Sequence, residues 1–167
     1  MFSSMSTGGM SPHSESIAYY GSESVEWIVI IYMFLASTNF YLHFQSITTR
    51  DPNRYFRNSE FRLYLGIVLM ATVIITASQW GKQWNDLSDG VRTTLFQVVS
   101  LISSTGFTTT NYLLWDQAVV FLLLALIVIG GSTGSTAGGI KVARFFLTRE
   151  FIASALHKTV HPRSIFT

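Results

Sequence analysis

The feature that most constrains this chain is a pair of long apolar stretches without formal charge. The first runs from Trp27 to Thr49, and the second covers the 19 residues from Leu63 to Gly81. A helix needs about 20 apolar residues to cross a bilayer core of about 30 Å, and one Arg or Lys at its centre costs about 2.5 kcal/mol or more. We therefore predict two membrane crossings, the first from outside to inside and the second back to the outside.

The composition supports a membrane protein. Hydrophobic residues make up 49% of the sequence and charged residues 12%, about half of the roughly 25% found in soluble domains. The net charge of +2 is too small to suggest nucleic acid as a partner, and the absence of cysteine excludes disulfides and thiolate metal sites. By the positive-inside rule, two basic clusters predict cytoplasmic segments: Arg50, Arg54, Arg57 and Arg62, and then Lys141, Arg144, Arg149, Lys158 and Arg163. The region from Lys82 to Arg92 then faces outward.

A third apolar segment is interrupted. Val91 to Ser103 is only 13 residues long, a length typical of buried or re-entrant helices. Ala118 to Ile129 contains twelve consecutive apolar residues, but the stretch "GGSTGSTAGG" follows before the chain resumes with "IKVARFFL". Irregular backbone at membrane depth is tolerated only inside protein or beside a water-filled cavity. We therefore expect something polar to pass near this glycine-rich stretch.

An internal repeat links the two halves of the chain. An offset of 97 positions aligns "SSMSTGGMS" at 3–11 with "SLISSTGFT" at 100–108, with three identities, and each copy precedes a polar outer linker and a crossing. The fold class expected is all-α integral membrane, built from repeated units of helix, pore helix, filter loop and helix. Residues 1–49 form the second half of one unit, 50–62 a cytoplasmic linker, 63–158 a complete unit and 159–167 a cytoplasmic tail. We expect the chain to be part of a larger protein.

The glycine-rich stretch superficially resembles a phosphate-binding loop. A Walker A motif requires glycine directly before the lysine and a short strand before the loop. Here Ile140 separates Gly139 from Lys141, and the preceding run is Leu-rich. A nucleotide-binding membrane enzyme is therefore disfavoured, and the sequence contains no pattern of paired carboxylates or activated nucleophile typical of an enzyme.

The stretch "SSTGFTTT" favours ion coordination instead. It follows the short apolar helix, whose C-terminus carries partial negative charge, and a glycine-containing extended loop can turn its carbonyl oxygens toward a common axis. Rings of such carbonyls replace the hydration shell of a monovalent cation in selectivity filters. Gly106 would be required where the backbone adopts angles that other residues avoid, and the hydroxyls of Ser104, Thr105 and Thr108 could hold the loop. The plainer alternative is an extracellular turn.

These residues carry a family resemblance. "SSTGFTTTNY" and, some twenty residues later, "IGGSTGSTAGGIKVARF" resemble the third pore repeat of the Trk/Ktr/HKT superfamily of potassium transporters, most closely the TrkH/TrkG-type bacterial subunits. "STGGMSPHSES" resembles the second-repeat filter, in which the family usually has Phe where Met10 stands. The resemblance implies K⁺ uptake through a filter made by Thr7, Gly8, Gly9 and Met10 together with Ser104, Thr105, Gly106 and Phe107. Glycine at positions 9 and 106 is associated in this family with preference for K⁺ over Na⁺.

The resemblance also implies a gate below the filter. In this family the broken helix forms an intramembrane loop that obstructs the pore, which corresponds here to Gly130, Gly131, Ser132, Thr133, Gly134, Ser135, Thr136, Ala137, Gly138 and Gly139. The alternative is a static kink for helix packing. The family further implies a multi-pass location in the bacterial inner membrane, a homodimer, a cytosolic nucleotide-binding ring (TrkA-like) as regulator, and no cofactor apart from the transported K⁺.

Three further polar residues are candidates for gating or partner contacts. Asn39 lies on the predicted first crossing, one turn from His43, and an interhelical hydrogen bond is the plainer role for it. Lys141 and Arg144 are three residues apart and are expected on one helical face, where they would be cytoplasmic anchors or gate contacts. The leading hypothesis is passive, gated K⁺ uptake, and the alternative is a membrane scaffold whose glycine loop is only a packing kink.

Overall fold

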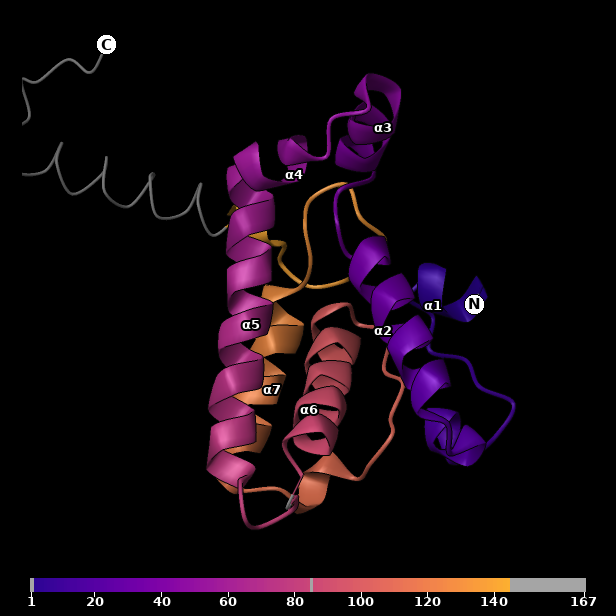
Figure 1. Cartoon of the computed structure of the whole chain (residues 1–167), viewed down its shortest axis with the longest axis vertical. Coiled ribbons are helices and arrows are strands. Elements are labelled where there is room, and N and C mark those ends of the chain that lie inside the picture. The colour runs from indigo at the N-terminus through magenta and orange to yellow at the C-terminus, as the bar shows by residue number, and fades with distance from the viewer. Residues whose placement is uncertain (1, 85, 145–167) are drawn as a thin grey trace, which may run out of the picture.

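The computed structural model describes residues 2–84 and 86–144, and these residues are helical without any extended strand (Figure 1). The only bridge pairing within this part of the chain joins Trp80 and Trp84 in a turn. The elements, in chain order, are α1 (Phe2–Met5), the 3₁₀ turn η1 (Ser16–Tyr20), α2 (Glu23–Ala36), α3 (Phe40–Thr49), α4 (Asn53–Arg57), α5 (Ser59–Gln79), α6 (Leu87–Ile102), η2 (Tyr112–Leu114) and α7 (Gln117–Ile129).

The predicted second crossing is a single continuous helix. α5 (Ser59–Gln79) has 21 residues, begins four residues before the apolar run and is the one helix in the described residues that is long and apolar enough to cross a membrane alone. Asn58 starts it by accepting a hydrogen bond at its side-chain oxygen from the Phe61 N–H, at 3.0 Å. Such a cap satisfies one of the free N–H groups in the first turn, so the basic linker ends where α5 begins.

The predicted first crossing from Trp27 to Thr49 is not a single helix. α2 ends at Ala36 and α3 begins at Phe40, with a bend of 96° between them, so the pair is a broken span or a re-entrant segment. The break has a physical cause. The Ser37 hydroxyl donates to the Met33 carbonyl at 2.6 Å, which also accepts the Ser37 N–H, and back-bonding of this kind often bends a helix. Asn39 then caps α3 through the Tyr41 N–H, so it does not lie on a continuous helix face with His43.

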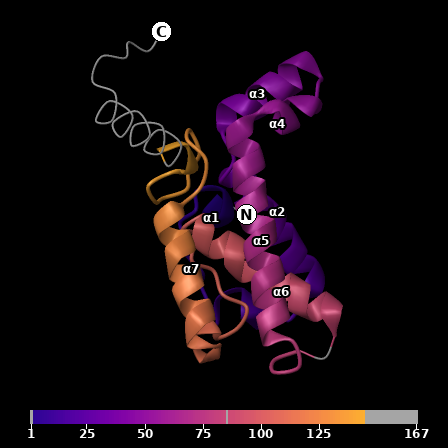
Figure 2. The ribbon, with the colours of Figure 1, turned by 90° about the vertical axis from the view of Figure 1, so that its left-hand side faces the viewer.

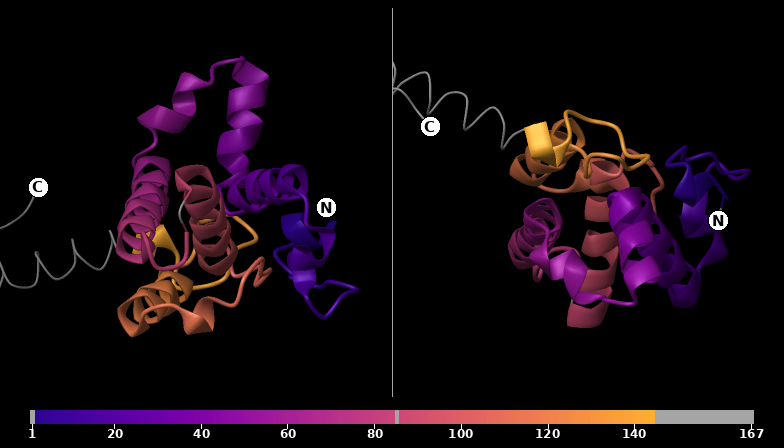
Figure 3. Two further views of the ribbon diagram at one scale, coloured as in Figure 1. Left: turned by 60° about the horizontal axis from the view of Figure 1, so that its bottom comes forward. Right: turned by 90° about the horizontal axis from the view of Figure 1, so that it is seen from above.

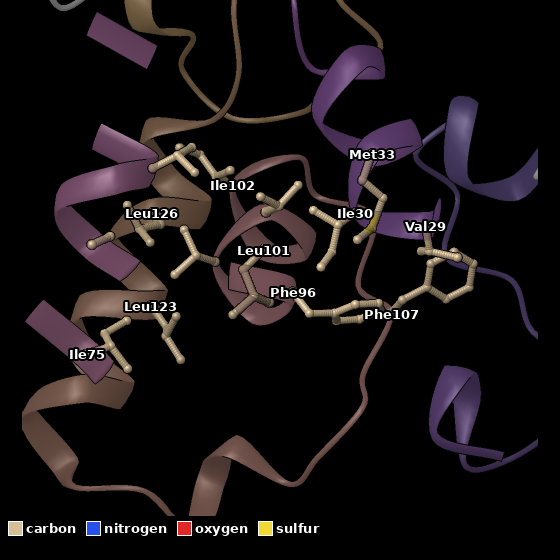
Figure 4. Packing of buried hydrophobic residues seen from close by; sticks show 14 of the residues in the cluster. Val29, Ile30, Met33, Ile75, Phe96, Leu101, Ile102, Phe107, Leu123 and Leu126 are labelled. Carbon is tan, nitrogen blue, oxygen red and sulfur yellow. The ribbon is translucent and has the colours of Figure 1, made fainter. Parts of the chain in front are cut away.

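The pore helix predicted at 91–103 is the centre of the structure. α6 (Leu87–Ile102) begins after its N-cap Asp86, four residues earlier than expected, and packs against α5, α2 and α7 (Figures 1 and 2). Its side chains Phe96, Leu101 and Ile102 meet residues of all three neighbours in one buried cluster (Figure 4). This helix is therefore buried between three other helices, as expected for a segment too short to span.

A charged group ties the start of α6 to α2. The Arg92 side chain, 14% exposed, bonds Glu23 at 3.0 Å, Glu26 at 2.8 Å and Asp89 at 2.9 Å. Partial burial alone would lower the pKa of Arg92, but the hydrogen bond with Glu23 and the charges of the three carboxylates raise it above its ordinary value. The guanidinium thus stays charged, and it joins α2, which precedes the basic linker at 50–62, to α6, which follows it.

Candidate functional site

Two loops predicted to form filters have the same backbone hydrogen-bond pattern. After α1, the N–H groups of Ser6, Thr7 and Gly8 donate to the carbonyls of Phe2, Ser4 and Ser3. After α6, the N–H groups of Ser103, Ser104 and Thr105 donate to those of Val99, Leu101 and Ser100. Each donor and each acceptor in the second set is offset by 97 positions from its counterpart in the first. The sequence repeat therefore corresponds to a repeated local structure.

The two loops also share unusual backbone angles. Thr7 and Ser104 have φ of 51° and 59°, and the matched glycines Gly9 and Gly106 have φ of 61° and 80°. Two features of Gly9 exclude a side chain: its positive φ, and a Cβ position only 1.8 Å from the Thr105 carbonyl oxygen. Positive φ is tolerated best by glycine. The close approach also shows that the two filter loops lie against each other.

Two serines that the sequence analysis did not single out hold these loops. The Ser100 hydroxyl donates to the Phe107 carbonyl at 2.6 Å, and the matched Ser3 hydroxyl accepts from the Met10 N–H at 2.8 Å. Ser103 reinforces the second loop through Ser100 and Thr105. The hydroxyls predicted for this role are those of Ser104, Thr105 and Thr108, and of these the Thr105 hydroxyl shares a hydrogen bond with Ser103 at 2.7 Å. The missed signal is that Ser3 and Ser100 are themselves identities of the repeat.

Environments differ at the last filter position. Phe107 is buried in the hydrophobic cluster, whereas Met10 is 78% exposed. Phe107 packs near Val29 and Ile30 of α2 (Figure 4). The eight residues lie in two loops of repeated backbone form, and binding of K⁺ by their carbonyls stays a prediction.

The glycine-rich loop leaves α7 and returns to its starting point. α7 ends at Ile129, and the N–H groups of Ile140 and Lys141 donate to the carbonyls of Val128 and Ile129 at 2.9 and 3.0 Å. Residues 130–139 therefore make a closed excursion between two touching ends. A Cβ on Gly139 would lie 2.6 Å from the Gly130 Cα. The crossing is interrupted at the predicted residue, and the glycines are needed where the ends meet.

This loop contacts both filter loops. The Thr7 hydroxyl donates to the Thr136 carbonyl at 2.9 Å, and the Thr136 hydroxyl donates to the Met5 carbonyl at 3.0 Å. On the other side, a Cβ on Gly138 would lie 2.8 Å from the Ser104 hydroxyl oxygen. In Figure 1 the loop passes across the end of α6, between α5 and α2. Residues far apart in the sequence are thereby gathered at one place.

The break between α2 and α3 accommodates the same loop. The Ser132 and Thr136 N–H groups donate to the carbonyls of Ser37 and Ala36 at 2.9 and 3.2 Å, and Phe40 donates to Gly134 at 3.1 Å. In a continuous helix the two carbonyls would accept from residues four positions later. The loop thus takes over hydrogen bonds that the bent crossing gives up, which explains why the sequence of that crossing alone did not predict the bend.

Charged and amide side chains from three other places in the chain also lie at this loop. Glu60, in the first turn of α5, accepts a hydrogen bond from the Thr133 N–H, a role that sequence analysis missed. The Lys141 ammonium donates to the carbonyls of Ala137 and Ser135. A Cβ on Gly134 would lie 3.2 Å from the Asn39 side-chain oxygen. The sequence does not indicate this role, because Glu60 lies in the basic linker, next to residues expected to face the cytoplasm.

Of the three gating candidates, two lie at the loop. Asn39 and Lys141 contact it, whereas Arg144 is exposed and makes no side-chain hydrogen bond or ion pair within 2–84 and 86–144. The expectation that Lys141 and Arg144 share a helical face is wrong, because Lys141 has φ of 76° and precedes the helical residues Val142 to Arg144. The tail residues 145–167, including the predicted Arg149, Lys158 and Arg163, lie outside the described residues.

Comparison with known proteins identifies the family. Residues 1–167 match the family model described as TrkH, cation transport protein. This chain belongs to the TrkH family. It is 35% identical to the Trk system potassium uptake protein TrkH of Salmonella typhimurium, and the match covers 99% of the chain and 35% of that protein. It is 30% identical to the corresponding TrkG of Escherichia coli, over 99% of the chain and 34% of the relative.

A solved relative has the same fold as this TrkH-family chain. The crystal structure of the potassium transporter TrkH from Vibrio parahaemolyticus matches with a TM-score of 0.88 and 32% identity, covering 99% of the chain and 36% of that protein. The predicted all-α membrane fold is thereby confirmed. The chain spans about a third of the length of the relatives it matches.

Proposed function

We propose that this chain supplies two of the filter loops and the gate of a passive pathway for K⁺ across a membrane. The observation that carries the proposal is the position of residues 130–139, which hydrogen-bond to the loop at Thr7 and lie against the loop at Ser104. A segment in contact with both filter loops is placed to block or release an ion that leaves them. The relatives named above as potassium uptake proteins support K⁺ as the ion.

The chemistry of the loops supports a monovalent cation. Their polar groups are backbone carbonyls and hydroxyls, and within residues 2–84 and 86–144 no three His, Cys, Asp or Glu side chains cluster as a metal site would need. Neutral carbonyl oxygens replace water around K⁺ without holding it too strongly. Divalent cations usually require carboxylate ligands. The filter residues in this proposal are Thr7, Gly8, Gly9, Met10, Ser104, Thr105, Gly106 and Phe107.

The remaining parts of the transporter enter the proposal through the family. We place the protein in the bacterial inner membrane as a homodimer, with a cytosolic nucleotide-binding ring as its regulator and no cofactor besides the transported K⁺. The basic linker that contains α4, and the exposed Arg144 beyond the gate, then face the cytoplasm by the positive-inside rule. The ring, and not this chain, would bind nucleotide.

A static packing kink is the second candidate for the loop. The close approach at Gly131, where a Cβ would lie 2.7 Å from the Ala137 side chain and 2.8 Å from the Ser37 carbonyl, favours it because tight packing alone would demand glycine. Deletion of residues 132–137 in the complete subunit separates the two. A gate predicts faster K⁺ flux into proteoliposomes, whereas a packing kink predicts flux at or below the wild-type rate.

The filter assignment is tested separately by Gly106→Ser in the complete subunit. A Cβ there meets no atom within 4 Å, but φ of 80° strains any residue with a side chain. We expect the ratio of K⁺ to Na⁺ flux to fall. Gly66→Ser on α5, also open and without positive φ, is the matched control. An unchanged ratio in Gly106→Ser would remove the filter assignment, whatever the deletion shows.

A further inference from the structure

The bent segment α3–α4 presents a basic groove that the ion pathway does not use. A cavity of about 340 Å³ is lined by Leu42 and Gln45 of α3, Arg54 and Arg57 of α4, and Asn58. Figures 2 and 3 show α3 and α4 projecting from the helical body at the end where α5 begins. The groove therefore lies away from the filter loops.

The arginines of this groove have no acidic partner among the residues that the structure describes. Among residues 2–84 and 86–144, the ion pairs are made by Lys82 and Arg92, and none by Arg50, Arg54, Arg57 or Arg62. Arg54 is half-buried and Arg57 exposed. Two guanidinium groups beside amide side chains form a donor set suited to a phosphate group, which arginine recognises by paired hydrogen bonds.

An apolar face of α3 borders the groove. Phe40, Tyr41, Phe44 and Ile47 are 40%, 66%, 66% and 77% exposed and recur at the three- and four-residue spacing of one helix face. Tyr41 lies one helical turn before Gln45, which lines the groove, so the two surfaces adjoin. A ligand that fits both must have a phosphate group and an apolar portion.

The orientation of α3 fits the surface of a bilayer. α3 is turned by 96° from α2 and lies at the end where the spanning helix α5 begins (Figure 2), so in a bilayer crossed by α5 it is placed at the membrane surface. Amphipathic helices with aromatic residues on one face and cations nearby lie in the headgroup region. The anionic cytoplasmic leaflet attracts such basic segments.

We infer that the groove between α3 and α4 binds the headgroup of an anionic phospholipid, with Arg54 and Arg57 on its phosphate and the Phe44 face of α3 against its acyl chains. The inference requires that the basic linker is cytoplasmic. It does not require that the loop at 130–139 is a gate. Loss of the proposed gating function would therefore leave this site intact.

Native mass spectrometry of the complete subunit tests the site with phosphatidylglycerol as the probe. We expect Arg54→Gln/Arg57→Gln to weaken retention of one phosphatidylglycerol about 30-fold, from the contribution of two arginines near an anionic surface. Arg50→Gln/Arg62→Gln removes the same charge outside the groove and should retain that lipid. Equal losses in both double variants, or no loss in either, would overturn the inference.

Competition distinguishes the source of the phosphate group. Free glycerol 3-phosphate in excess should not displace the lipid, because it lacks the apolar portion, and phosphatidylcholine should not replace it. If glycerol 3-phosphate binds the groove as tightly as the lipid does, the site is one for a soluble phosphate and the inference is wrong.

Spin labelling tests the apolar face without disturbing the arginines. The sequence has no cysteine, so Phe44→Cys introduces a single labelling site into this chain. In phosphatidylglycerol nanodiscs we expect a label there to be several-fold more accessible to oxygen than to a water-soluble nickel chelate. The exposed Asn53→Cys on α4 is the control, with the opposite preference expected. A label at position 44 that is shielded from both reagents would indicate a protein partner and overturn the inference.

Discussion

Thr7 and Thr136 are 129 residues apart in the sequence and are joined by a hydrogen bond of 2.9 Å from the Thr7 hydroxyl to the Thr136 carbonyl. The Thr136 hydroxyl in turn donates to the carbonyls of Met5 and Ala36, at 3.0 and 3.2 Å. One residue of the glycine loop is thus held by the first filter loop and by the end of α2. In the proposed gate, opening of the loop has to break these bonds.

Thr136→Val should therefore favour the open loop. The substitution removes the hydroxyl donor but keeps the shape of the side chain, and a hydrogen bond of this kind contributes about 1 kcal/mol. We expect K⁺ flux into proteoliposomes to rise about fivefold, the factor that corresponds to 1 kcal/mol in an equilibrium constant.

The neighbouring Thr133 supplies the control for this change. Its side-chain hydroxyl makes no hydrogen bond within the described part of the chain, and the residue is exposed. Thr133→Val should leave K⁺ flux unchanged. Equal flux in wild type, Thr133→Val and Thr136→Val would show that these bonds do not limit opening.

Gly9→Ala should disrupt the contact between the filter loops. A methyl group at this position would lie 1.8 Å from the Thr105 carbonyl oxygen, and φ of 61° adds a backbone cost of about 1 kcal/mol or more. One loop must move, so we expect a lower ratio of K⁺ to Na⁺ flux together with slower K⁺ uptake. Gly21→Ala, with φ of 52° and no neighbour within 4 Å, has the strain without the collision. If both variants behave alike, the contact between the loops does not set selectivity.

Local patterns were sufficient to predict much of this structure. The charge-free run at 63–81 overlaps most of α5, the short run at 91–103 covers the end of α6 and its C-cap, and the apolar run at 118–129 ends where α7 ends. Each depends on hydrophobicity and helix length, which are properties of contiguous residues. The positive φ at Gly106 also followed from the sequence, because a glycine within a hydroxyl-rich loop indicates a backbone that other residues avoid.

The features that were not predicted depend on residues distant in sequence. Trp27 to Thr49 has the composition of one crossing, and its bend is stabilised by N–H groups of Ser132 and Thr136. The role of Glu60 likewise depends on Thr133, 73 positions away. Long-range hydrogen bonds of this kind leave no periodic signal in either partner's own segment.

Glu60→Ala should loosen the loop from the side of α5. Its carboxylate accepts from the Thr133 N–H, and a charge-assisted hydrogen bond contributes about 1.5–3 kcal/mol when it is well shielded. Glu60 is only half-buried, so we expect the smaller effect, a rise in K⁺ flux of several-fold. Glu60→Gln keeps an acceptor oxygen and should lie between Glu60→Ala and wild type.

The exposed Glu15 provides a matched loss of charge away from the loop. Glu15→Ala should not change K⁺ flux at saturating K⁺ concentration. A rise in Glu15→Ala equal to that in Glu60→Ala would mean that flux responds to net charge and not to the hydrogen bond on the loop.

Arg92→Met should destabilise the packing of α2 against α6. Arg92 and Glu26 have side chains only 14% and 16% exposed, so removing the guanidinium leaves a shielded carboxylate without its partner. Breaking a buried ion pair in this way costs about 3 kcal/mol.

Lys82→Met is the control. It removes a cation from the exposed pair with Asp116, and the two side chains of this pair are 58% and 46% exposed. Such pairs contribute at most about 1 kcal/mol. Chemical unfolding of the complete subunit in mixed micelles, followed by fluorescence, should rank the two variants in this order. The double variant Arg92→Met/Glu26→Gln should recover part of the loss, since it leaves no unpaired charge at that position, and additive losses would show that the two residues do not stabilise each other.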